Sequence, residues 1–255
     1  MNKIREMIQE GKKPIGTFYD LGGQTAVECI ALSGIDYIII DTEHGSIDLE
    51  TAKMAICAAE YRGSVPFVRV KEISRAAILK MLDAGAKGLV IPCVKTVDEV
   101  KEIVEYGKYF PVGNRGFAHT AASAFGTSEF AGNLEKHFQQ SNEKTLLLPQ
   151  CETAECLEDL ENIVAIDGVD GIFVGPFDLS ISLGIPGQMD NPIMIDAMKR
   201  IQKVCKDAGK LSFIFSGSVE DSKLKLGWGY DSVTCGMDAM FLLNAYKSLI
   251  ADIRA

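Results

Sequence analysis

The sequence predicts an α/β fold, a (β/α)8 barrel of the TIM type, from three observations. Eight short apolar runs alternate with stretches of helical periodicity, and strands alternating with helices form right-handed βαβ units around a parallel sheet. The chain has 255 residues, close to the roughly 250 residues of a closed barrel. A doubly wound open sheet is the alternative, but no Gly-x-Gly-x-x-Gly follows the first apolar run, which weakens a dinucleotide-binding interpretation.

The eight expected strands are short apolar runs, rich in β-branched residues, that polar or glycine-rich turns bound. In chain order they span residues 15–19, 37–40, 66–70, 88–91, 145–148, 171–174, 211–215 and 232–235. Helical periodicity fills most of the intervals, at residues 24–33, 49–61, 74–82, 97–108, 153–166, 192–208 and 219–226. A final apolar helix at 240–253 either closes the barrel or packs on a neighbouring subunit.

One connection is much longer than the others. About 50 residues separate the fourth and fifth strands, and after a first helix they contain Pro-Val-Gly-Asn-Arg-Gly at 111–116 and a run of small residues at 121–127. Long loops of this kind usually carry function or make contacts. Because no linker or repeat divides the chain, we expect a single domain over residues 1–255.

The charge, the cysteine pattern and the apolar segments of the chain indicate which binding partners and which cellular location to expect. The net charge is −9, which argues against nucleic-acid or anionic-membrane partners. Seven cysteines are scattered without a Cys-x-x-Cys motif, so reduced thiols in the cytoplasm are expected. No apolar stretch reaches the ~20 residues that span a bilayer, and residues 1–9 lack the apolar core of a signal peptide.

Polar side chains gather where the expected strands end. In a parallel α/β barrel the carboxyl ends of the strands carry the chemistry, whereas the turns at the amino ends serve stability. The residues at these carboxyl ends are Asp41, Glu43 and His44 after the second strand, Arg69 in the third, Gln150 and Glu152 after the fifth, and Gly175, Pro176 and Asp178 after the sixth.

Two carboxylates from adjacent strands form a candidate metal site. A barrel places Glu152 and Asp178 side by side, and carboxylates with few nitrogen or sulfur ligands suit a hard ion such as Mg²⁺ or Mn²⁺. The alternative is that both carboxylates cap helix N-termini, since Glu152 precedes an expected helix and Asp178 precedes Leu179 and Ser180.

A histidine and an arginine complete the candidate site. Asp41 can hold the His44 ring and raise its basicity, as expected of a general base; the alternative is a solvent-facing loop histidine. The Arg69 guanidinium can fork onto a carboxylate or an enolate oxygen. It can also form a salt bridge with Asp41 or Glu43, and the two roles are compatible.

The motifs of the chain resemble those of the HpcH/HpaI aldolases, metal-dependent class II enzymes that cleave 4-hydroxy-2-oxo acids. The matching segments follow one another in family order, and the most specific are IDTEHG and GIFVGPFDLS. They are IDTEHG (40–45), VRV (68–70), LDAGAKGLVIPCV (82–94), PVGNRG (111–116), QCET (150–153), GVDGIFVGPFDLSISLG (168–184) and GYDSVTCGMD (229–238).

The resemblance implies a TIM barrel that cleaves a 4-hydroxy-2-oxo acid to pyruvate and an aldehyde, reversibly. It implies roles for the residues at the strand ends. Glu152 and Asp178 bind Mg²⁺, Mn²⁺ or Co²⁺, His44 with Asp41 is the general base, Arg69 stabilises the enolate, Gln150 contacts the keto oxygen, and the backbone near Gly175 and Pro176 receives the carboxylate of pyruvate.

The resemblance also implies an assembly. Members of the family typically form homo-oligomers, hexamers built as trimers of dimers that exchange a C-terminal helix. Asp83 of the LDAG segment and Arg115 of the NRG loop then lie near subunit contacts and the site.

Two departures from the family pattern affect the pocket. The first strand carries Phe18 and Tyr19 where the family usually has tryptophan, and Cys151 replaces a branched apolar residue between Gln150 and Glu152. We expect both to reshape the pocket, so the sequence does not specify the aldehyde, the preferred metal or the physiological direction.

Three other functions remain open. A Schiff-base aldolase needs a desolvated lysine at a strand end, and Lys71 and Lys95 are near such positions. A lyase acting on malyl-type or citramalyl-type acyl-CoA thioesters shares the metal carboxylates but usually has a longer chain. A barrel that only binds a ligand fits poorly, because so many ionisable groups are costly to gather without use.

Overall fold

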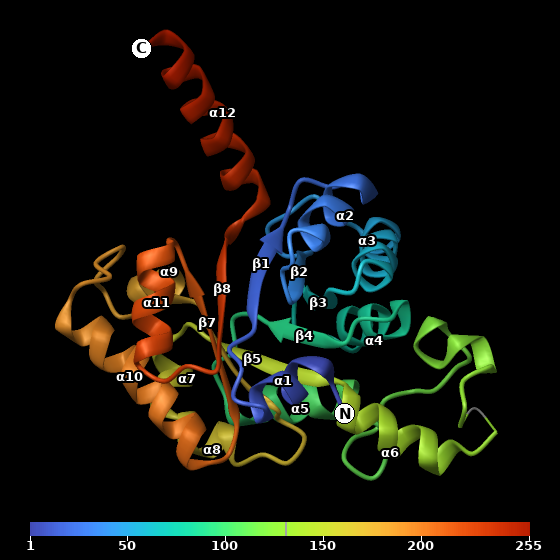
Figure 1. Cartoon of the computed structure of the whole chain (residues 1–255). Coiled ribbons are helices and arrows are strands. Elements are labelled where there is room, and N and C mark those ends of the chain that lie inside the picture. Colours follow the sequence, from blue (N-terminus) through green and yellow to red (C-terminus); the bar gives the residue numbers. More distant parts are fainter. Residues whose placement is uncertain (131) are drawn as a thin grey trace.

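The computed structural model describes residues 1–130 and 132–255 and confirms the TIM-type barrel. Eight parallel strands pair in chain order, and β1 closes the ring against β8 (Figure 1). Each strand lies where the sequence predicts it, although β5 and β8 run further toward their carboxyl ends. The strands are β1 (Ile15–Tyr19), β2 (Tyr37–Asp41), β3 (Val65–Arg69), β4 (Gly88–Ile91), β5 (Leu146–Cys151), β6 (Gly171–Val174), β7 (Leu211–Ser216) and β8 (Ser232–Met237).

Helices surround the barrel and fill the long insertion. The expectation of one helix over 153–166 is wrong, because the chain breaks at Asp159 (ψ 12°) into two short helices. The helices are α1 (Lys3–Gln9), α2 (Gln24–Leu32), α3 (Leu49–Tyr61), α4 (Arg75–Ala84), α5 (Val97–Gly107), the 3₁₀ helix η1 (Ala121–Gly126), α6 (Leu134–Lys144), α7 (Ala154–Glu158), α8 (Leu160–Val164), α9 (Pro176–Ser182), α10 (Pro192–Asp207), α11 (Val219–Gly227) and α12 (Asp238–Arg254).

Each strand has an inner and an outer face. Successive strand residues point to opposite sides, so Tyr37 and Ile39 of β2 belong to the core inside the barrel, whereas Ile38 and Ile40 belong to the core between barrel and helices. The α1 helix lies at the amino-terminal end, where Ile4 is fully buried and packs with the inner core. The carboxyl end of the barrel thus remains the open end.

Tyr37 links three strands across the inside of the barrel. Its ring passes over β1 because Gly16 has no side chain; a Cβ there would lie 2.1 Å from the ring. The Tyr37 hydroxyl is 2.8 Å from both the Ser232 and the Thr234 hydroxyl oxygens of β8. These buried hydrogen bonds tie β2 to β8 beneath the site.

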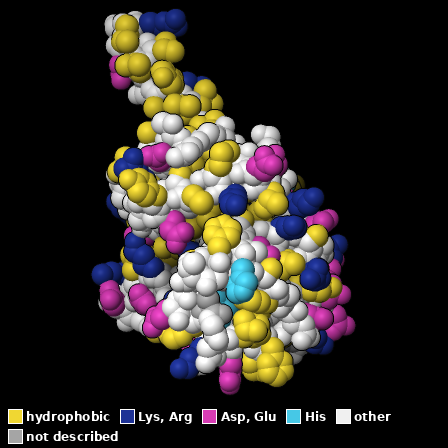
Figure 2. All heavy atoms as spheres, turned by 90° about the vertical axis from the view of Figure 1, so that its right-hand side faces the viewer, with side chains coloured by type: hydrophobic (Ala, Val, Ile, Leu, Met, Phe, Trp, Pro, Cys, Tyr) yellow, Lys and Arg dark blue, Asp and Glu magenta, His cyan; other side chains and the backbone are white. Residues whose placement is uncertain are grey.

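The C-terminal helix α12 leaves the barrel instead of packing against it, so it does not close the barrel. Figure 1 shows it projecting away from the other helices, and Figure 2 shows hydrophobic side chains along this projection. Its large apolar residues are about half exposed or more: Met240, Phe241, Leu242, Leu243, Tyr246, Leu249, Ile250 and Ile253. Neither this helix nor any other among residues 1–130 and 132–255 is long and apolar enough to cross a bilayer.

We expect Tyr37→Phe to lower the free energy of unfolding by about 1–3 kcal/mol, because buried hydroxyl partners on β8 lose their bonds. Urea unfolding followed by circular dichroism measures the difference. Tyr61→Phe, at a side chain that is 80% exposed, is the matched control and should change stability little. Equal stability of the two variants would contradict the role of the Tyr37 hydroxyl.

Candidate active site

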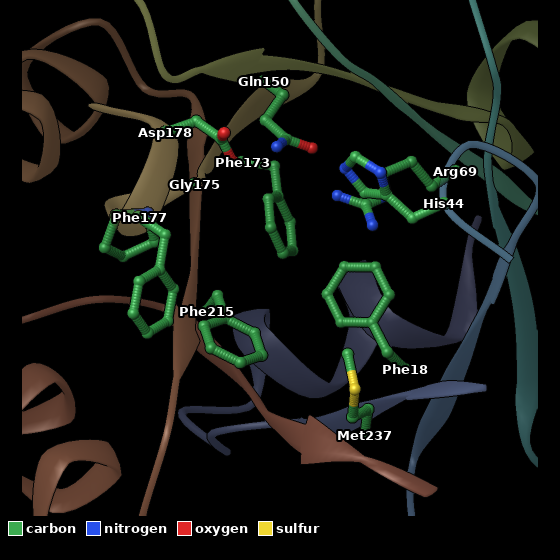
Figure 3. A pocket seen from close by; sticks show the side chains of 11 residues that line it. Phe18, His44, Arg69, Gln150, Phe173, Gly175, Phe177, Asp178, Phe215 and Met237 are labelled. Carbon is green, nitrogen blue, oxygen red and sulfur yellow. The ribbon is translucent and has the colours of Figure 1, made fainter. Parts of the chain in front are cut away.

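A cavity of about 160 Å³ opens at the carboxyl ends of the strands. Figure 3 shows Gln150, His44 and Arg69 on its polar side and aromatic rings opposite them. The cavity joins predicted site residues from the loop after β2, from β3 and β5, and from the start of α9 in one place. Its walls are Phe18, His44, Arg69, Gln150, Phe173, Gly175, Pro176, Phe177, Asp178, Phe215 and Met237.

Arg69 and Asp41 form a buried ion pair at the edge of this cavity. The two residues are in register on neighbouring strands, and Arg69 donates from Nε to Asp41 Oδ1 at 2.9 Å and from Nη2 to Oδ2 at 2.5 Å. Burial opposes ionisation of Asp41, but the hydrogen bonds and charge of Arg69 outweigh it and hold the pKa of Asp41 below its ordinary value. The pair fixes the guanidinium plane, which lies 4.7 Å from the centre of the Phe18 ring.

Glu43 is a second carboxylate beside Arg69, and the sequence did not single it out as a site residue. Its Oε2 lies 3.2 Å from Arg69 Nε, and no described residue gives this buried oxygen a hydrogen bond. Burial raises the pKa of Glu43. The Asp-Thr-Glu-His spacing was the available signal, because it brings two carboxylates to one strand end.

His44 reaches the cavity from the loop after β2, but its ring is not held as expected. The Asp41 carboxylate meets only the His44 backbone N–H, at 3.5 Å, because both of its oxygens bind Arg69. The imidazole Nε2 lies 3.8 Å from Glu43 Oε2, and the side chain is 68% exposed. The ring can therefore exchange protons with solvent and with a molecule in the cavity.

Glu152 is buried behind the cavity wall and does not cap a helix. Thr153 caps α7, while Glu152 Oε1 accepts from the Cys93 backbone N–H at 2.6 Å and Oε2 accepts from the Gln150 amide. Asp178 lies in the first turn of α9 and faces the cavity. Burial raises the pKa of Glu152, and the negative charges of Asp178 and Glu43 raise it further.

The donor set fits a divalent cation bound mainly by substrate and water. Gln150 Oε1 and Glu43 Oε2 are buried and accept no hydrogen bond within the described chain, and neighbouring carboxylates repel each other until a cation neutralises them. Among residues 1–130 and 132–255, no three His, Cys, Asp or Glu side chains converge as ligands. Glu152 and Asp178 would thus supply two protein ligands and leave several positions open.

Gly175 makes the space in front of Glu152. A Cβ at Gly175 would lie 2.6 Å from Glu152 Oε2 and 2.7 Å from Gln150 Nε2. The missing side chain allows both polar groups to approach the backbone where α9 begins. The first-turn N–H groups of a helix have no acceptor within the helix and attract anions.

Of the three residues at which the chain departs from the family pattern, only one lines the cavity. Phe18 lines the cavity, but Cys151 is buried in the outer core and Tyr19 bonds the Gly23 carbonyl, so neither shapes the cavity. The aromatic wall from Phe173, Phe177 and Phe215, with Met237, was not foreseen; strand alternation was the signal for Phe173 and Phe215.

The two lysines considered for a Schiff base, Lys71 and Lys95, are exposed and do not line the cavity. A desolvated amine is therefore missing from the described site, and a lysine aldolase has no support here.

Asp83 and Arg115 lie together but away from the cavity. Arg115 Nη2 is 2.8 Å from Asp83 Oδ1, at the end of α4 that precedes β4. Within one chain they do not reach the barrel mouth.

Asp20, just after β1, supports a pH-dependent prediction. Burial, with the negative charges of Asp41 and Asp238, raises its pKa to about 6. The folded state thus holds this proton more tightly than the unfolded chain, so the stability contribution of Asp20 falls as the pH rises from about 4 to about 6. After allowance for partial exposure, Asp20→Asn should raise the free energy of unfolding by about 1 kcal/mol at pH 8 and by little at pH 4.

Urea unfolding at both pH values measures this difference. Asp196→Asn, at an exposed position of α10, is the matched control. An equal effect of Asp20→Asn at pH 4 and pH 8 would contradict the raised pKa.

Comparison with known proteins places the whole chain in one family. The family described as HpcH/HpaI aldolase/citrate lyase matches residues 15–245. A hydroxypyruvate/pyruvate aldolase of Rhizorhabdus wittichii is 33% identical, with all of both chains covered. A 2-keto-3-deoxy-L-rhamnonate aldolase of Salmonella gallinarum is 32% identical over all of this chain and 94% of its own.

A solved structure agrees with these relatives. A HpcH/HpaI aldolase/citrate lyase family protein from Burkholderia cenocepacia superposes with a TM-score of 0.91 at 31% identity, covering both chains completely. The predicted resemblance is confirmed, and the chain belongs to the HpcH/HpaI aldolase/citrate lyase family.

Proposed function

We propose that residues 1–255 form one aldolase domain that cleaves a 4-hydroxy-2-oxo acid to pyruvate and an aldehyde, reversibly, with a divalent metal ion. The observation that carries the proposal is the convergence of Arg69, the unpartnered Gln150 Oε1 and the carboxylate Asp178 on one cavity, with Glu152 directly behind it. Full-length relatives named as pyruvate and keto-acid aldolases support the same reaction class.

Glu152 and Asp178 would hold the metal ion, which can be Mg²⁺, Mn²⁺ or Co²⁺. When bound, such an ion supplies Lewis-acid polarisation of a 2-keto group and balances the charge that develops on its oxygen. The Cys93 N–H and the Gln150 amide orient the two Glu152 oxygens.

Arg69 and Gln150 prepare the cavity for a 2-oxo acid. Two hydrogen bonds to Asp41 fix the orientation of the Arg69 guanidinium. Its positive charge therefore stays beside the cavity, where it stabilises an enolate oxygen electrostatically. The Gln150 side-chain N–H₂, which gives one hydrogen bond to Glu152, donates its second N–H to the keto oxygen, and the N–H groups at the start of α9, next to Gly175 and Pro176, receive the carboxylate. The binding geometry therefore favours the enolate of pyruvate as the carbon–carbon bond breaks.

His44 takes the proton of the 4-hydroxyl group, directly or through one water molecule. Loss of this proton turns the C4–oxygen bond into the carbonyl of the aldehyde, and the electrons of the C3–C4 bond pass into the pyruvate enolate. Protonation at C3 then gives pyruvate. The exposed His44 ring returns its proton to solvent, and in reverse the same groups perform aldol addition.

The second candidate is cleavage of a citrate-like or acyl-CoA thioester substrate, which the family description aldolase/citrate lyase keeps open. Pyruvate release from a panel of 4-hydroxy-2-oxo acids, with EDTA and then with Mn²⁺ restored, separates the candidates. Metal-dependent release supports the aldolase. Release that survives EDTA, or no release from any 4-hydroxy-2-oxo acid under either condition, would overturn it.

We expect Glu152→Gln to abolish metal-dependent pyruvate release while the fold persists, because the amide keeps the shape but removes the anionic ligand. Steady-state rates over a Mn²⁺ titration measure the loss. Glu155→Gln, at an exposed position three residues on, should retain normal activity. Normal Mn²⁺ dependence in Glu152→Gln would refute the assignment.

His44→Ala should lower kcat on the order of 10²–10⁴-fold, as expected for loss of a general base. The effect should fall on kcat more than on KM, since Arg69 and Gln150 remain to bind the oxo acid. His119→Ala is the control, because His119 lies in the insertion outside the cavity walls. Unchanged cleavage by His44→Ala would show that another group takes the proton.

The projecting helix α12 supports a further part of the proposal, a homo-oligomer in which subunits exchange their C-terminal helices. An isolated helix with so much exposed apolar surface is unfavourable in water, and exchange of an identical element buries it without a new fold. We propose that such dimers build a hexamer. The cytoplasmic location expected from the cysteines stays a prediction.

Leu243→Glu combined with Ile250→Glu should therefore dissociate the assembly, because it places charge on the apolar helix. Light scattering after size-exclusion chromatography measures the mass. Lys247→Gln, on the same helix, is the control and should keep the native mass. A monomeric native protein, or an unchanged mass in the double variant, would contradict helix exchange.

A further inference from the structure

A second cavity lies at the opposite end of the barrel from the active-site cavity. Its volume is about 180 Å³, far above the roughly 10–15 Å³ that one buried water needs. It borders the residues that precede β4 and β5, with walls from the end of α4, from η1 and from α6. Its cationic groups come from Lys87, Arg115 and Lys144, its imidazole from His137 and its hydroxyl groups from Ser128, Ser141 and Thr145, and no carboxylate of the described chain lines it.

Arg115 presents a buried charge to this cavity. Its side chain is only 2% exposed, and its Nη2 pairs with Asp83 at 2.8 Å. The guanidinium also lies 4.7 Å from the centre of the Tyr109 ring. These contacts fix its orientation but leave Nε buried without a partner in the described residues.

A second orphaned polar group lines the same cavity. Ser128 Oγ is buried and has no hydrogen-bond partner within residues 1–130 and 132–255. A buried donor without an acceptor destabilises a fold, so such groups usually face a ligand, an ion or water. Two of them beside one cavity indicate that an acceptor belongs there.

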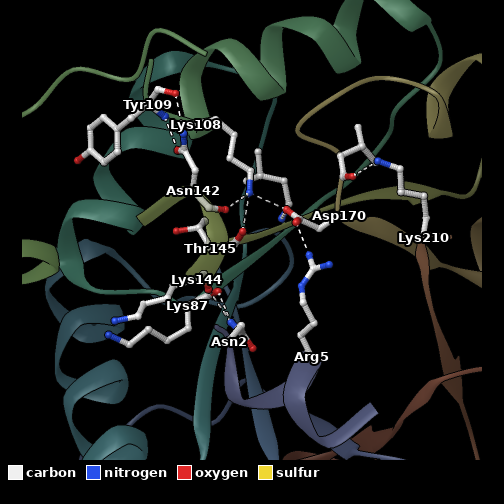
Figure 4. A network of polar contacts seen from close by, with 12 residues as sticks. Asn2, Arg5, Lys87, Lys108, Tyr109, Asn142, Lys144, Thr145, Asp170 and Lys210 are labelled. Atoms are coloured by element: carbon white, nitrogen blue, oxygen red, sulfur yellow. Dashed lines mark hydrogen bonds and ion pairs between the residues drawn. The ribbon is translucent and has the colours of Figure 1, made fainter. Parts of the chain in front are cut away.

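Two lysines add positive charge at the cavity edge. The Asn2 side-chain amide donates to the carbonyl oxygens of both Lys87 and Lys144, at 3.0 and 2.7 Å, and so holds the two residues next to each other (Figure 4). Lys87 pairs with Glu60 at 3.0 Å. Lys144 has no ion pair in the described part of the chain, so its charge remains available.

The lowered pKa of His137 is consistent with positive charge around this cavity. His137 is 7% exposed, and burial, followed by the charges of Arg115, His119 and Lys144, lowers its pKa. Cationic groups from α6, from the turn before β4 and from the insertion thus converge on this cavity, and Asp83 and Glu60, which pair with Arg115 and Lys87, are not among its walls.

We propose that this cavity binds a phosphate-type oxyanion, either free phosphate or the phosphate group of a small monoester. Arg115 Nε and Ser128 Oγ donate to two of the oxygens of the anion. The ammonium group of Lys144 supplies positive charge at the entrance of the cavity. Lys87 adds less, because Glu60 partly neutralises its charge. A tetrahedral oxyanion offers several acceptors in different directions, which suits donors converging from separate elements. Within one chain this cavity shares no lining residue with the active-site cavity.

Calorimetric titration of the full-length protein with inorganic phosphate tests the proposal without any activity assay. We expect one site per chain in the native protein. Lys144→Met should weaken phosphate binding about tenfold or more, because a charge-assisted hydrogen bond is lost. Ser128→Ala, which removes only one hydroxyl, should weaken binding less and keeps the proposal testable if Lys144→Met folds poorly.

Lys136→Met is the matched control, since Lys136 is an exposed lysine of the same helix outside the cavity. It should bind phosphate like the native protein. Equal weakening by Lys136→Met and Lys144→Met would show a general charge effect and overturn the site, as would the absence of phosphate binding in the native protein. Binding unchanged by both Lys144→Met and Ser128→Ala would place the anion elsewhere and also overturn it.

A second titration with methyl phosphate identifies the source of the anion. Binding as tight as that of phosphate or tighter, with the same sensitivity to Lys144→Met, assigns an organic monoester. Binding of phosphate alone assigns the free ion. Because the readout is binding, failure of this proposal is distinguishable from failure of the aldolase proposal.

Discussion

Arg69 occupies the position on which the geometry of the active site depends. It comes from β3, in register with Asp41 of β2, so parallel pairing alone brings the two charges together. Asp41 takes the guanidinium in a two-point hydrogen bond, and Glu43 approaches from the loop above. A buried arginine without such partners would be strongly destabilising. With them it becomes a rigid positive charge at the barrel mouth, available to an oxo acid.

On the other side of the cavity, the geometry of the site depends on Gly175, because this residue has no side chain. Gly175 leaves room for Glu152 and Gln150 to stand against the start of α9. The Gln150 amide donates to Glu152, and its oxygen has no hydrogen-bond partner among residues 1–130 and 132–255. Anionic and neutral oxygen ligands therefore face the positive arginine across a small space. These oxygens would bind a divalent cation, and the cation together with Arg69 would suit a substrate that carries both a carboxylate and a keto oxygen.

Strand periodicity made much of this site predictable. Gln150 in β5 and Glu152 just after it point to the same side of the chain, and Cys151 between them must face the helices. The expectation that Cys151 shapes the cavity neglected this alternation. The salt bridge of Arg69 with Asp41 or Glu43 was one of two compatible expectations, and both carboxylates contact it. The ring of His44 was not predictable, because it sits in a loop where no periodicity fixes its direction.

The C-terminal helix and the long insertion could not be placed from the sequence, for a different reason. The apolar residues of α12 predicted a buried helix, but hydrophobic pattern does not say whether the burying surface belongs to the same chain. The cavity around Arg115 was likewise invisible in the sequence, because its groups come from four separate segments. Burial of Arg115 depends on the fold of the insertion, which has little regular periodicity.

The proposed reaction requires that the cavity stabilise the enolate of pyruvate. Exchange of the pyruvate methyl protons for deuterium in D₂O, followed by NMR, tests it without knowledge of the aldehyde. The proposed reaction predicts exchange that requires the protein and a divalent metal ion, stops with EDTA and returns with Mn²⁺. Pyruvate whose methyl protons remain unexchanged in the metal-loaded protein would contradict it.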